Sequence, residues 1–230
     1  MPTFALIPAA GSGSRMAASS PKQYSLLAGK PMLWHAVRAV CVPQVAAVFV
    51  VLAGNDAQFA QFDWSAYAGK LYPLYCGGAT RRDSVYNGLV AARDTVNADD
   101  WVLVHDAARP CLPGADLHRL MDEGARDVVG AILALPVADT VKTAAKDDAG
   151  VVRIVATQDR SQLWLAQTPQ MFRAGLLLQA LPQARDATDE AAAVERLGLK
   201  PRLVAGSREN LKVTYAEDLA IAESILERRP

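Results

Sequence analysis

Apolar runs of strand length recur along the chain and are separated by longer segments with helical character. Strands are predicted at residues 3–7, 44–52, 70–75, 101–104, 128–135 and 202–205. Most of these runs are continuously apolar rather than alternating, which is typical of strands covered on both faces. Helices are predicted at residues 31–40, 82–96, 113–126, 169–184, 187–197 and 215–226. Alternating strands and helices predict an α/β domain with a mostly parallel sheet and helices on both sides.

Residues 137–160 break this alternation. Extended stretches at 139–142 and 151–156 flank a turn-like stretch at 146–150, which predicts a β-hairpin. A hairpin of this length has no obvious place in the main sheet, and two strands alone are only marginally stable in water. We therefore expect it to pack on a second subunit, as the dimerisation arm of a single domain that spans residues 1–230.

The composition narrows the class of protein. A chain of 230 residues is long enough for one domain with a full core. Its 24 basic and 24 acidic side chains give a formal net charge of +0, which argues against general binding to nucleic acid or to a membrane surface. Three cysteines without metal-site spacing indicate free thiols in a reducing compartment. The apolar N-terminal stretch has strand length and no basic residues before it, so we expect a cytoplasmic protein.

The first predicted strand ends in a loop of small residues that includes Gly11 and Gly13. Glycines let backbone N–H groups approach an anion closely, and Arg15 and Lys22 add positive charge nearby. This pattern favours a triphosphate site, although an ordinary strand-to-helix turn explains the loop as well. Met16 occupies the third glycine position of the dinucleotide-binding fingerprint, and the Walker spacing is absent, so neither common nucleotide motif fits.

Two further motifs follow predicted strands, and the carboxyl ends of parallel strands meet at one edge of the sheet. Gly77 and Gly78 follow the strand at 70–75, and Asp106 follows the strand at 101–104. We therefore expect both motifs beside the glycine loop. Asp106 is the best candidate for a Mg²⁺ ligand at a triphosphate site, with a turn or helix cap as the alternative. A lone His105 is more typical of a structural role.

Other polar positions have two interpretations each. Arg81 and Ser84 lie at the start of the predicted helix after Gly77 and Gly78, where we expect contacts to a base or ribose, but helix capping explains Ser84 nearly as well. Lys212 lies in a short extended segment, and without further information a surface lysine is the simpler interpretation. Residues 188–190 are typical of a helix cap with favourable charge, and residues 168–170 of a turn.

The order of these motifs resembles the 2-C-methyl-D-erythritol 4-phosphate cytidylyltransferases, enzymes of the non-mevalonate isoprenoid pathway. The resemblance extends from Ile7 to about Leu219. The motifs are L-I-P-A-A-G-S-G-S-R-M, P-K-Q-Y, G-G-A-T-R-R-D-S-V, H-D-A-A-R-P, D-T-V-K, D-R, L-W-L-A-Q-T-P-Q-M-F, T-D-E-A and N-L-K-V-T.

The resemblance implies a Rossmann-like nucleotidyltransferase domain and a homodimer that uses Mg²⁺, CTP and methylerythritol phosphate and releases pyrophosphate. It implies nucleotide contacts from Ala9, Ala10, Gly11, Gly13, Gly78, Arg81 and Ser84. It implies catalytic roles for Arg15, Lys22 and Lys212, and Asp106 as the Mg²⁺ ligand. The acceptor contacts would come from Arg109, Thr140, Arg160, Thr168 and Thr188, with Thr140 and Arg160 supplied by the partner's arm.

The sequence departs from the family at Ala79, where some relatives carry an acidic residue, so any side-chain contact there is lost, although a backbone contact would survive. Three rival functions remain. The nearest is the same chemistry on another acceptor, such as ribitol 5-phosphate or a sugar 1-phosphate. A nicotinamide-dependent oxidoreductase is disfavoured by Met16, and a non-catalytic nucleotide sensor would not require both Asp106 and Lys212.

Overall fold

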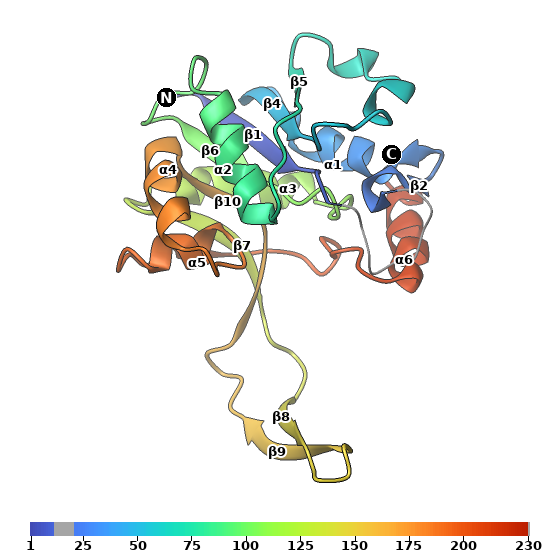
Figure 1. Ribbon diagram of the computed structural model, residues 1–230, viewed down its shortest axis with the longest axis vertical. Helices are drawn as coiled ribbons and strands as arrows, with labels where there is room; N and C mark the ends of the chain where they lie inside the picture. Colours follow the sequence, from blue (N-terminus) through green and yellow to red (C-terminus); the bar gives the residue numbers. More distant parts are fainter. Residues whose placement is uncertain (12–20, 230) are drawn as a thin grey trace.

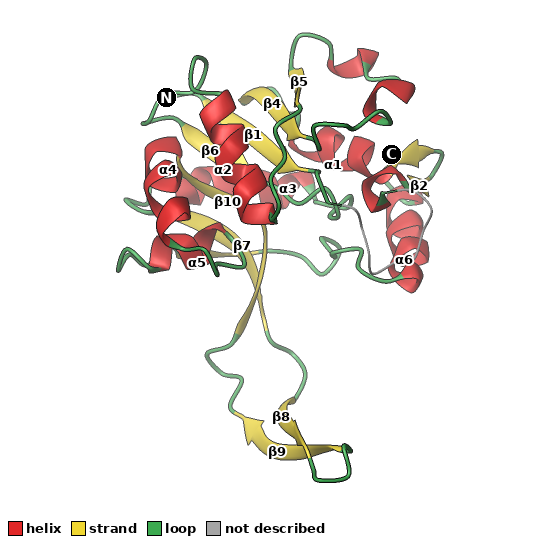
Figure 2. Ribbon diagram, viewed as in Figure 1, coloured by secondary structure: helices red, strands yellow, loops and turns green. Residues whose placement is uncertain are grey.

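The computed structural model describes residues 1–11 and 21–229, in which a seven-stranded sheet forms the centre of the molecule. The strand order is β11-β7-β10-β6-β1-β4-β5 (Figures 1 and 2). The strands are β1 (Thr3–Pro8), β4 (Val45–Val51), β5 (Leu71–Leu74), β6 (Trp101–Val104), β7 (Gly130–Pro136), β10 (Trp164–Arg173) and β11 (Arg202–Ala205). β10 runs antiparallel to both of its neighbours, and the other pairings are parallel. The predicted α/β fold with a mostly parallel sheet is confirmed.

Helices cover both faces of this sheet. They are α1 (Met32–Val40), α2 (Arg81–Ala91), α3 (Gly114–Gly124), α4 (Ala174–Gln183), α5 (Glu190–Glu195) and α6 (Ala216–Glu227). Ile7 of β1 packs in the core cluster of α1 and α3, whereas its neighbour Leu6 packs in that of α2, α4 and α5. Successive side chains of a strand point to opposite faces, so a run that is apolar throughout fills both clusters. Residues of α6 form a third cluster with Met32 and Val213.

Short elements connect these parts. β2 (Leu26–Leu27) and β3 (Lys30–Pro31) pair with each other, and single-turn 3-10 helices lie at Lys22–Tyr24, Phe59–Gln61 and Ser65–Tyr67. The helix predicted at 82–96 ends at Ala91, and the residues after it turn so that Val96 is buried. No helix in the described ranges is long and apolar enough to cross a membrane.

Strand β10 corrects two expectations. The helix predicted over 169–184 begins only at Ala174, and the turn predicted around Pro169 lies within the strand. Met171 and Phe172 are buried in clusters on opposite faces of the sheet, as adjacent strand residues are. Proline cannot donate to a strand ladder, and Pro169 lies where the pairing of β10 with β7 shifts register. The proline that argues against a strand in the sequence is accommodated by this irregularity.

The predicted hairpin is present as β8 (Val141–Lys146) and β9 (Val152–Gln158), which pair antiparallel in a sheet of their own. Figure 1 shows this arm projecting from the body, beyond the ends of β7 and β10. Every residue of β9 is exposed, including Ile154 at 68% and Val155 at 66%. The body of its own chain therefore leaves these apolar side chains uncovered.

Candidate active site

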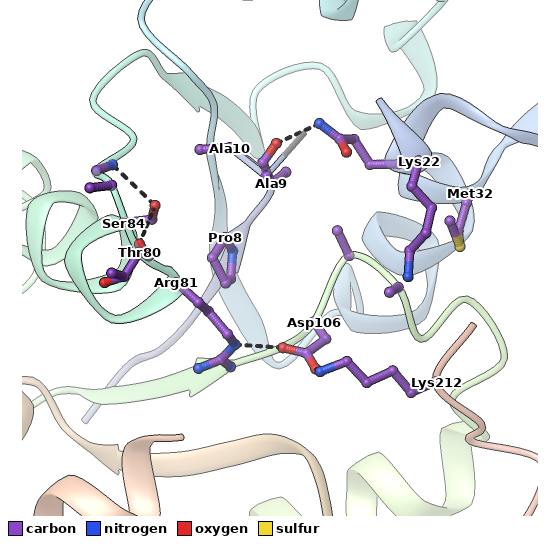
Figure 3. A pocket seen from close by; sticks show the side chains of 16 residues that line it. Pro8, Ala9, Ala10, Lys22, Met32, Thr80, Arg81, Ser84, Asp106 and Lys212 are labelled. Atoms are coloured by element: carbon purple, nitrogen blue, oxygen red, sulfur yellow. Dashed lines mark hydrogen bonds and ion pairs between the residues drawn. The ribbon is translucent and has the colours of Figure 1, made fainter. Parts of the chain in front are cut away.

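A cavity of about 450 Å³ lies at the carboxyl ends of β1 and β6. Its lining comes from the glycine loop, the start of α2, the turn after β6 and the C-terminal segment before α6 (Figure 3). The residues are Pro8, Ala9, Ala10, Gly11, Lys22, Gln23, Met32, Gly78, Ala79, Thr80, Arg81, Ser84, Asp106, Ala107, Ala108 and Lys212. The predicted convergence of three motifs on one sheet edge is confirmed.

Hydrogen bonds to backbone carbonyls fix the first wall of this cavity. The N–H of Ala9 donates to the carbonyl of Val51 at 2.8 Å, and Nε2 of Gln23 donates to the carbonyl of Ala9 at 2.7 Å. The side chain of Lys22 donates to the carbonyl of Val213, which joins the glycine loop region to the C-terminal segment. Gly13 and Arg15 lie outside the described residues.

The first turn of α2 forms the second wall. Thr80 and Asp83 form a reciprocal capping box, so Thr80, rather than Ser84, caps the helix. The hydroxyl of Ser84 accepts from the N–H of Gly78 at 3.1 Å and donates to the carbonyl of Thr80 at 3.0 Å. A Cβ at Gly78 would lie 2.4 Å from that of Asp83, so only glycine fits at this contact. The capping interpretation of Ser84 is therefore wrong, and its hydroxyl instead holds the glycine turn against the helix.

A buried carboxylate, Asp106, lies at the centre of the site and is surrounded by cations. Its Oδ1 is 2.8 Å from Nε of Arg81, and its Oδ2 is 2.8 Å from Nζ of Lys212. Nε of Arg109 lies 3.9 Å from Oδ2. Burial by itself raises the pKa of Asp106, but the neighbouring positive charges outweigh burial and hold this pKa well below its usual range. Asp106 is therefore ionised, and Lys212 is a site residue rather than a bland surface lysine.

Sequence reasoning did not find the second partner of Arg81. Its Nη1 and Nη2 donate to the two oxygens of Glu190 at 2.6 and 3.0 Å, and Glu190 is completely buried. Asp189, as predicted, caps α5 by accepting from the N–H of Ala192. The sequence assigns Glu190 only a favourable helix-end charge, because nothing local links it to an arginine 109 positions earlier.

A second cavity of about 230 Å³ adjoins the first and shares Arg81, Asp106 and Lys212 with it. Its other lining residues are Arg109, Ala166, Gln167, Thr168, Gln170, Thr188 and Asp189. The cations around Asp106 therefore lie at the junction of the two cavities.

The hydroxyl of Thr168 is engaged inside the protein. It accepts from the N–H of Asp106 at 2.9 Å and lies 3.1 Å from Nδ1 of His105. Burial lowers the pKa of His105 to about 4, so its ring is neutral. A neutral ring whose Nε2 lies 3.0 Å from the carbonyl of Arg109 donates there, which leaves Nδ1 to accept from Thr168. His105 thus has the structural role expected of it, and Thr168 fixes the backbone of Asp106.

Arg109 reaches the second cavity from a buried position. Its Nη1 donates to the carbonyl of Asn210 at 2.7 Å and its Nη2 to that of Ala166 at 3.3 Å. Two other predicted acceptor residues, Thr140 and Arg160, are exposed on or beside the arm and line neither cavity. Arg160 donates to the carbonyl of Ala138 in its own arm.

The site suits a Mg²⁺ ion that arrives with a nucleotide. The described part of the chain has no group of three or more His, Cys, Asp or Glu side chains placed to hold a metal. Mg²⁺ in nucleotide sites, however, is typically held by one or two carboxylates together with substrate phosphates. The ammonium of Lys212 already occupies a cation's place at Oδ2 of Asp106, and its side chain is 48% exposed. A cation therefore already binds this oxygen, and the exposed side chain of Lys212 leaves that lysine room to move away from it.

Comparison with known proteins identifies the family of the chain. Residues 3–228 match the family model of 2-C-methyl-D-erythritol 4-phosphate cytidylyltransferase. The chain is 54% identical to the protein of that name from Aromatoleum aromaticum over 98% of this chain and 96% of the relative. It is 55% identical to the one from Nitrosospira multiformis, covering 97% of each.

Solved structures give the same result. The fold matches a crystal structure of a 4-diphosphocytidyl-2C-methyl-D-erythritol synthase with a TM-score of 0.84 and 41% identity over 98% of both chains. The Francisella tularensis 2-C-methyl-D-erythritol 4-phosphate cytidylyltransferase matches with a TM-score of 0.81 and 34% identity, over 98% of this chain and 100% of that one. The chain therefore belongs to the 2-C-methyl-D-erythritol 4-phosphate cytidylyltransferase family.

Proposed function

We propose that this protein transfers the cytidylyl group of CTP to 2-C-methyl-D-erythritol 4-phosphate, giving 4-diphosphocytidyl-2-C-methyl-D-erythritol and pyrophosphate. The observation that carries this proposal is the pair of adjoining cavities that share Arg81, Asp106 and Lys212. A nucleotide in the larger cavity and a phosphorylated acceptor in the smaller one would meet at these charges. Family membership supplies the identity of the two substrates.

In the larger cavity, CTP would contact the loop and the start of α2. The contacts we assign to it come from Ala9, Ala10, Gly11, Gly13, Gly78, Arg81 and Ser84. Gly78 and Ser84, which hold each other by a hydrogen bond, would face the base. Arg81 is held in place by two carboxylates. We therefore propose that it shapes the nucleotide pocket and does not bind the phosphates.

The reaction forms a bond between an acceptor phosphate oxygen and the α-phosphorus of CTP, and the bond to the leaving pyrophosphate breaks. The acceptor phosphate is already ionised, so no strong base is needed, and catalysis consists of positioning and charge neutralisation. We assign this neutralisation to Lys22, Lys212 and Arg15. In the smaller cavity, Arg109 and Thr188 would contact the acceptor, while Thr168 would act through the backbone of Asp106.

We further propose that Asp106 holds Mg²⁺ in the nucleotide complex. The ion would supply charge neutralisation at the triphosphate. Lys212 would leave Oδ2 of Asp106 for the α-phosphate, which its half-exposed side chain permits. The three cysteines are unpaired, as in a reducing compartment, and we propose a cytoplasmic location.

The arm supports a homodimer. Its exposed apolar side chains include Val152, Ile154 and Val155, and a second copy related by two-fold symmetry would cover them reciprocally. Thr140 and Arg160 would then complete the partner's acceptor cavity.

The substrate assignment is tested by incubating the purified protein with each of the four nucleoside triphosphates and a panel of polyol phosphates, while following pyrophosphate release. We expect release with CTP and methylerythritol phosphate and much less with ribitol 5-phosphate. Faster release with another acceptor would overturn the assignment.

The shared site is tested by refolding a mixture of two inactive variants, Lys212→Ala in the body and Arg160→Ala in the arm. Random pairing makes about half of the dimers mixed, and in these one site collects both defects and the other neither, so roughly a quarter of all sites become intact. Recovery of about that fraction of wild-type activity is expected. A mixture that stays inactive despite proven subunit exchange would place Arg160 in its own chain's site.

A further inference from the structure

Glu190 is a fully buried carboxylate for which neither the sequence motifs nor the proposed reaction supplies a role beyond a helix-end charge. A buried charge is tolerated only when it is paired and hydrogen-bonded. Both oxygens of Glu190 are satisfied by one side chain, the guanidinium of Arg81, at 2.6 and 3.0 Å. The pair joins the start of α5 to the start of α2 behind the cavity junction.

The edge of the guanidinium that Glu190 uses determines what remains for Asp106. Arginine prefers to bind a carboxylate with two parallel N–H groups. Glu190 accepts the two hydrogen bonds donated by Nη1 and Nη2 of Arg81. Asp106 accepts only one hydrogen bond from Arg81, from Nε to Oδ1 at 2.8 Å. Oδ2 of Asp106 instead binds the ammonium of Lys212 at 2.8 Å, on a half-exposed side chain, while Nε of Arg109 lies farther away at 3.9 Å.

We infer that Glu190 is a positioning residue that restricts Arg81 to one oxygen of Asp106 and so reserves the other oxygen, Oδ2, for an exchangeable cation. This inference rests on the proposed function, in which that cation is Lys212 in the free protein and Mg²⁺ in the CTP complex. Without the charge of Glu190, Arg81 is free to turn its two-pronged edge onto Asp106. Both oxygens of Asp106 would then be engaged, and Oδ2 would no longer be available to the metal.

The charge balance supports the same role. Burial lowers the pKa of Arg81, but the two carboxylates raise it by more, so the guanidinium remains charged and held between them. Arg81 brings a cation to the site, and Glu190 cancels its charge. Arg81 lines both cavities but has its charge offset in this way, so we assign the action on substrate phosphates to other cations, such as Lys212.

The test measures CTP binding by calorimetry without acceptor, once with Mg²⁺ and once with a chelator. The dissociation constant measured with the chelator, divided by the one measured with Mg²⁺, reports how much the metal contributes to CTP binding. We call this quotient the Mg²⁺ ratio. Changes in the residues that orient metal ligands typically cost about 10- to 100-fold in metal affinity, so we expect Glu190→Gln to reduce the ratio toward one, by up to that factor. Glu195→Gln is the matched control, because it removes the same charge from an exposed position of the same helix; its ratio should equal that of the wild type.

A double variant separates positioning from a merely structural role. In Arg81→Met/Glu190→Gln, no buried charge is left unpaired and the guanidinium of Arg81 no longer competes for Oδ2 of Asp106. We therefore expect the Mg²⁺ ratio to recover, even though the loss of a cavity wall weakens CTP binding overall. Glu190→Asp, which keeps the charge on a shorter side chain, should give an intermediate ratio, and it replaces Glu190→Gln if circular dichroism shows that variant to be unfolded.

A wild-type ratio in the Glu190 variant, or a double variant as impaired as the single one, would overturn the inference. Failure of the underlying proposal has a different signature. If the wild type shows no Mg²⁺ ratio above one, or if Asp106→Asn leaves that ratio unchanged, the metal site itself is refuted and the role of Glu190 with it.

Discussion

Gly77 follows β5 and packs against the glycine loop with no room for a side chain. A Cβ at this position would lie 2.3 Å from the Cβ of Ala10 and 2.8 Å from the carbonyl oxygen of Leu52. Ordinary contacts begin near 3.4 Å, so Gly77→Ala requires the loop that carries Ala10 to move by about 1 Å in a close-packed interior. Because Ala10 lines the nucleotide cavity, this displacement acts directly on the proposed CTP site.

Two magnitudes follow from this displacement. Overpacking should lower the free energy of unfolding by about 1–3 kcal/mol. A 1 Å misplacement of groups that position a substrate costs up to about a hundredfold in rate, so kcat/KM for CTP should fall by about 10- to 100-fold. Urea denaturation measures the first effect, and pyrophosphate release at varied CTP measures the second.

Gly54→Ala provides the matched control, because its Cβ would meet only the carbonyl oxygen of Tyr75, at an ordinary 3.8 Å. This variant should keep the stability and kcat/KM of the wild type. If Gly77→Ala does so as well, the glycine loop does not depend on contact with Gly77, and the reasoning is refuted.

Three further predictions concern the charged cluster and the buried histidines. Asp106→Asn should lower kcat by on the order of a hundredfold or more with the fold intact by circular dichroism; near-normal turnover at saturating Mg²⁺ would contradict the metal assignment. Lys212→Met should lower kcat by about a hundredfold with a smaller change in CTP affinity, measured by calorimetry; an increase in KM alone would make Lys212 a binding residue only. Burial lowers the pKa of His105 to about 4 and lowers that of His35. The unfolded chain therefore takes up protons first as the pH falls, so the free energy of unfolding should decrease between about pH 6.5 and 4, by roughly 1.4 kcal/mol per pH unit for His105. Urea titrations at several pH values check this slope, which His105→Gln should flatten.

The sequence by itself determined the fold class and the place of the site. Continuous apolar runs such as β4 and β6 fill two faces of a sheet at once, so their composition already requires helices on both sides. Parallel strands bring their carboxyl ends to one edge, so the loop at Gly11, the turn at Gly78 and Asp106 had to meet. The hairpin between β7 and β10 was also predictable from the sequence. Its turn, and the break that it makes in the alternation of strands and helices, both lie within a short stretch of chain.

Only the tertiary structure decided how distant side chains pair. Strand β10 escaped prediction because Pro169 argues against a strand, and the register shift that accommodates it arises from pairing with β7. The sequence predicts that Thr168 is part of a turn, yet its hydroxyl accepts a hydrogen bond from the backbone N–H of Asp106, 62 positions away. The bond from Glu190 to Arg81 spans 109 positions. Periodicity and turn chemistry depend on near neighbours, so the sequence displays them directly; the partner of a buried charge is set by which elements pack together, and that is known only once the chain has folded.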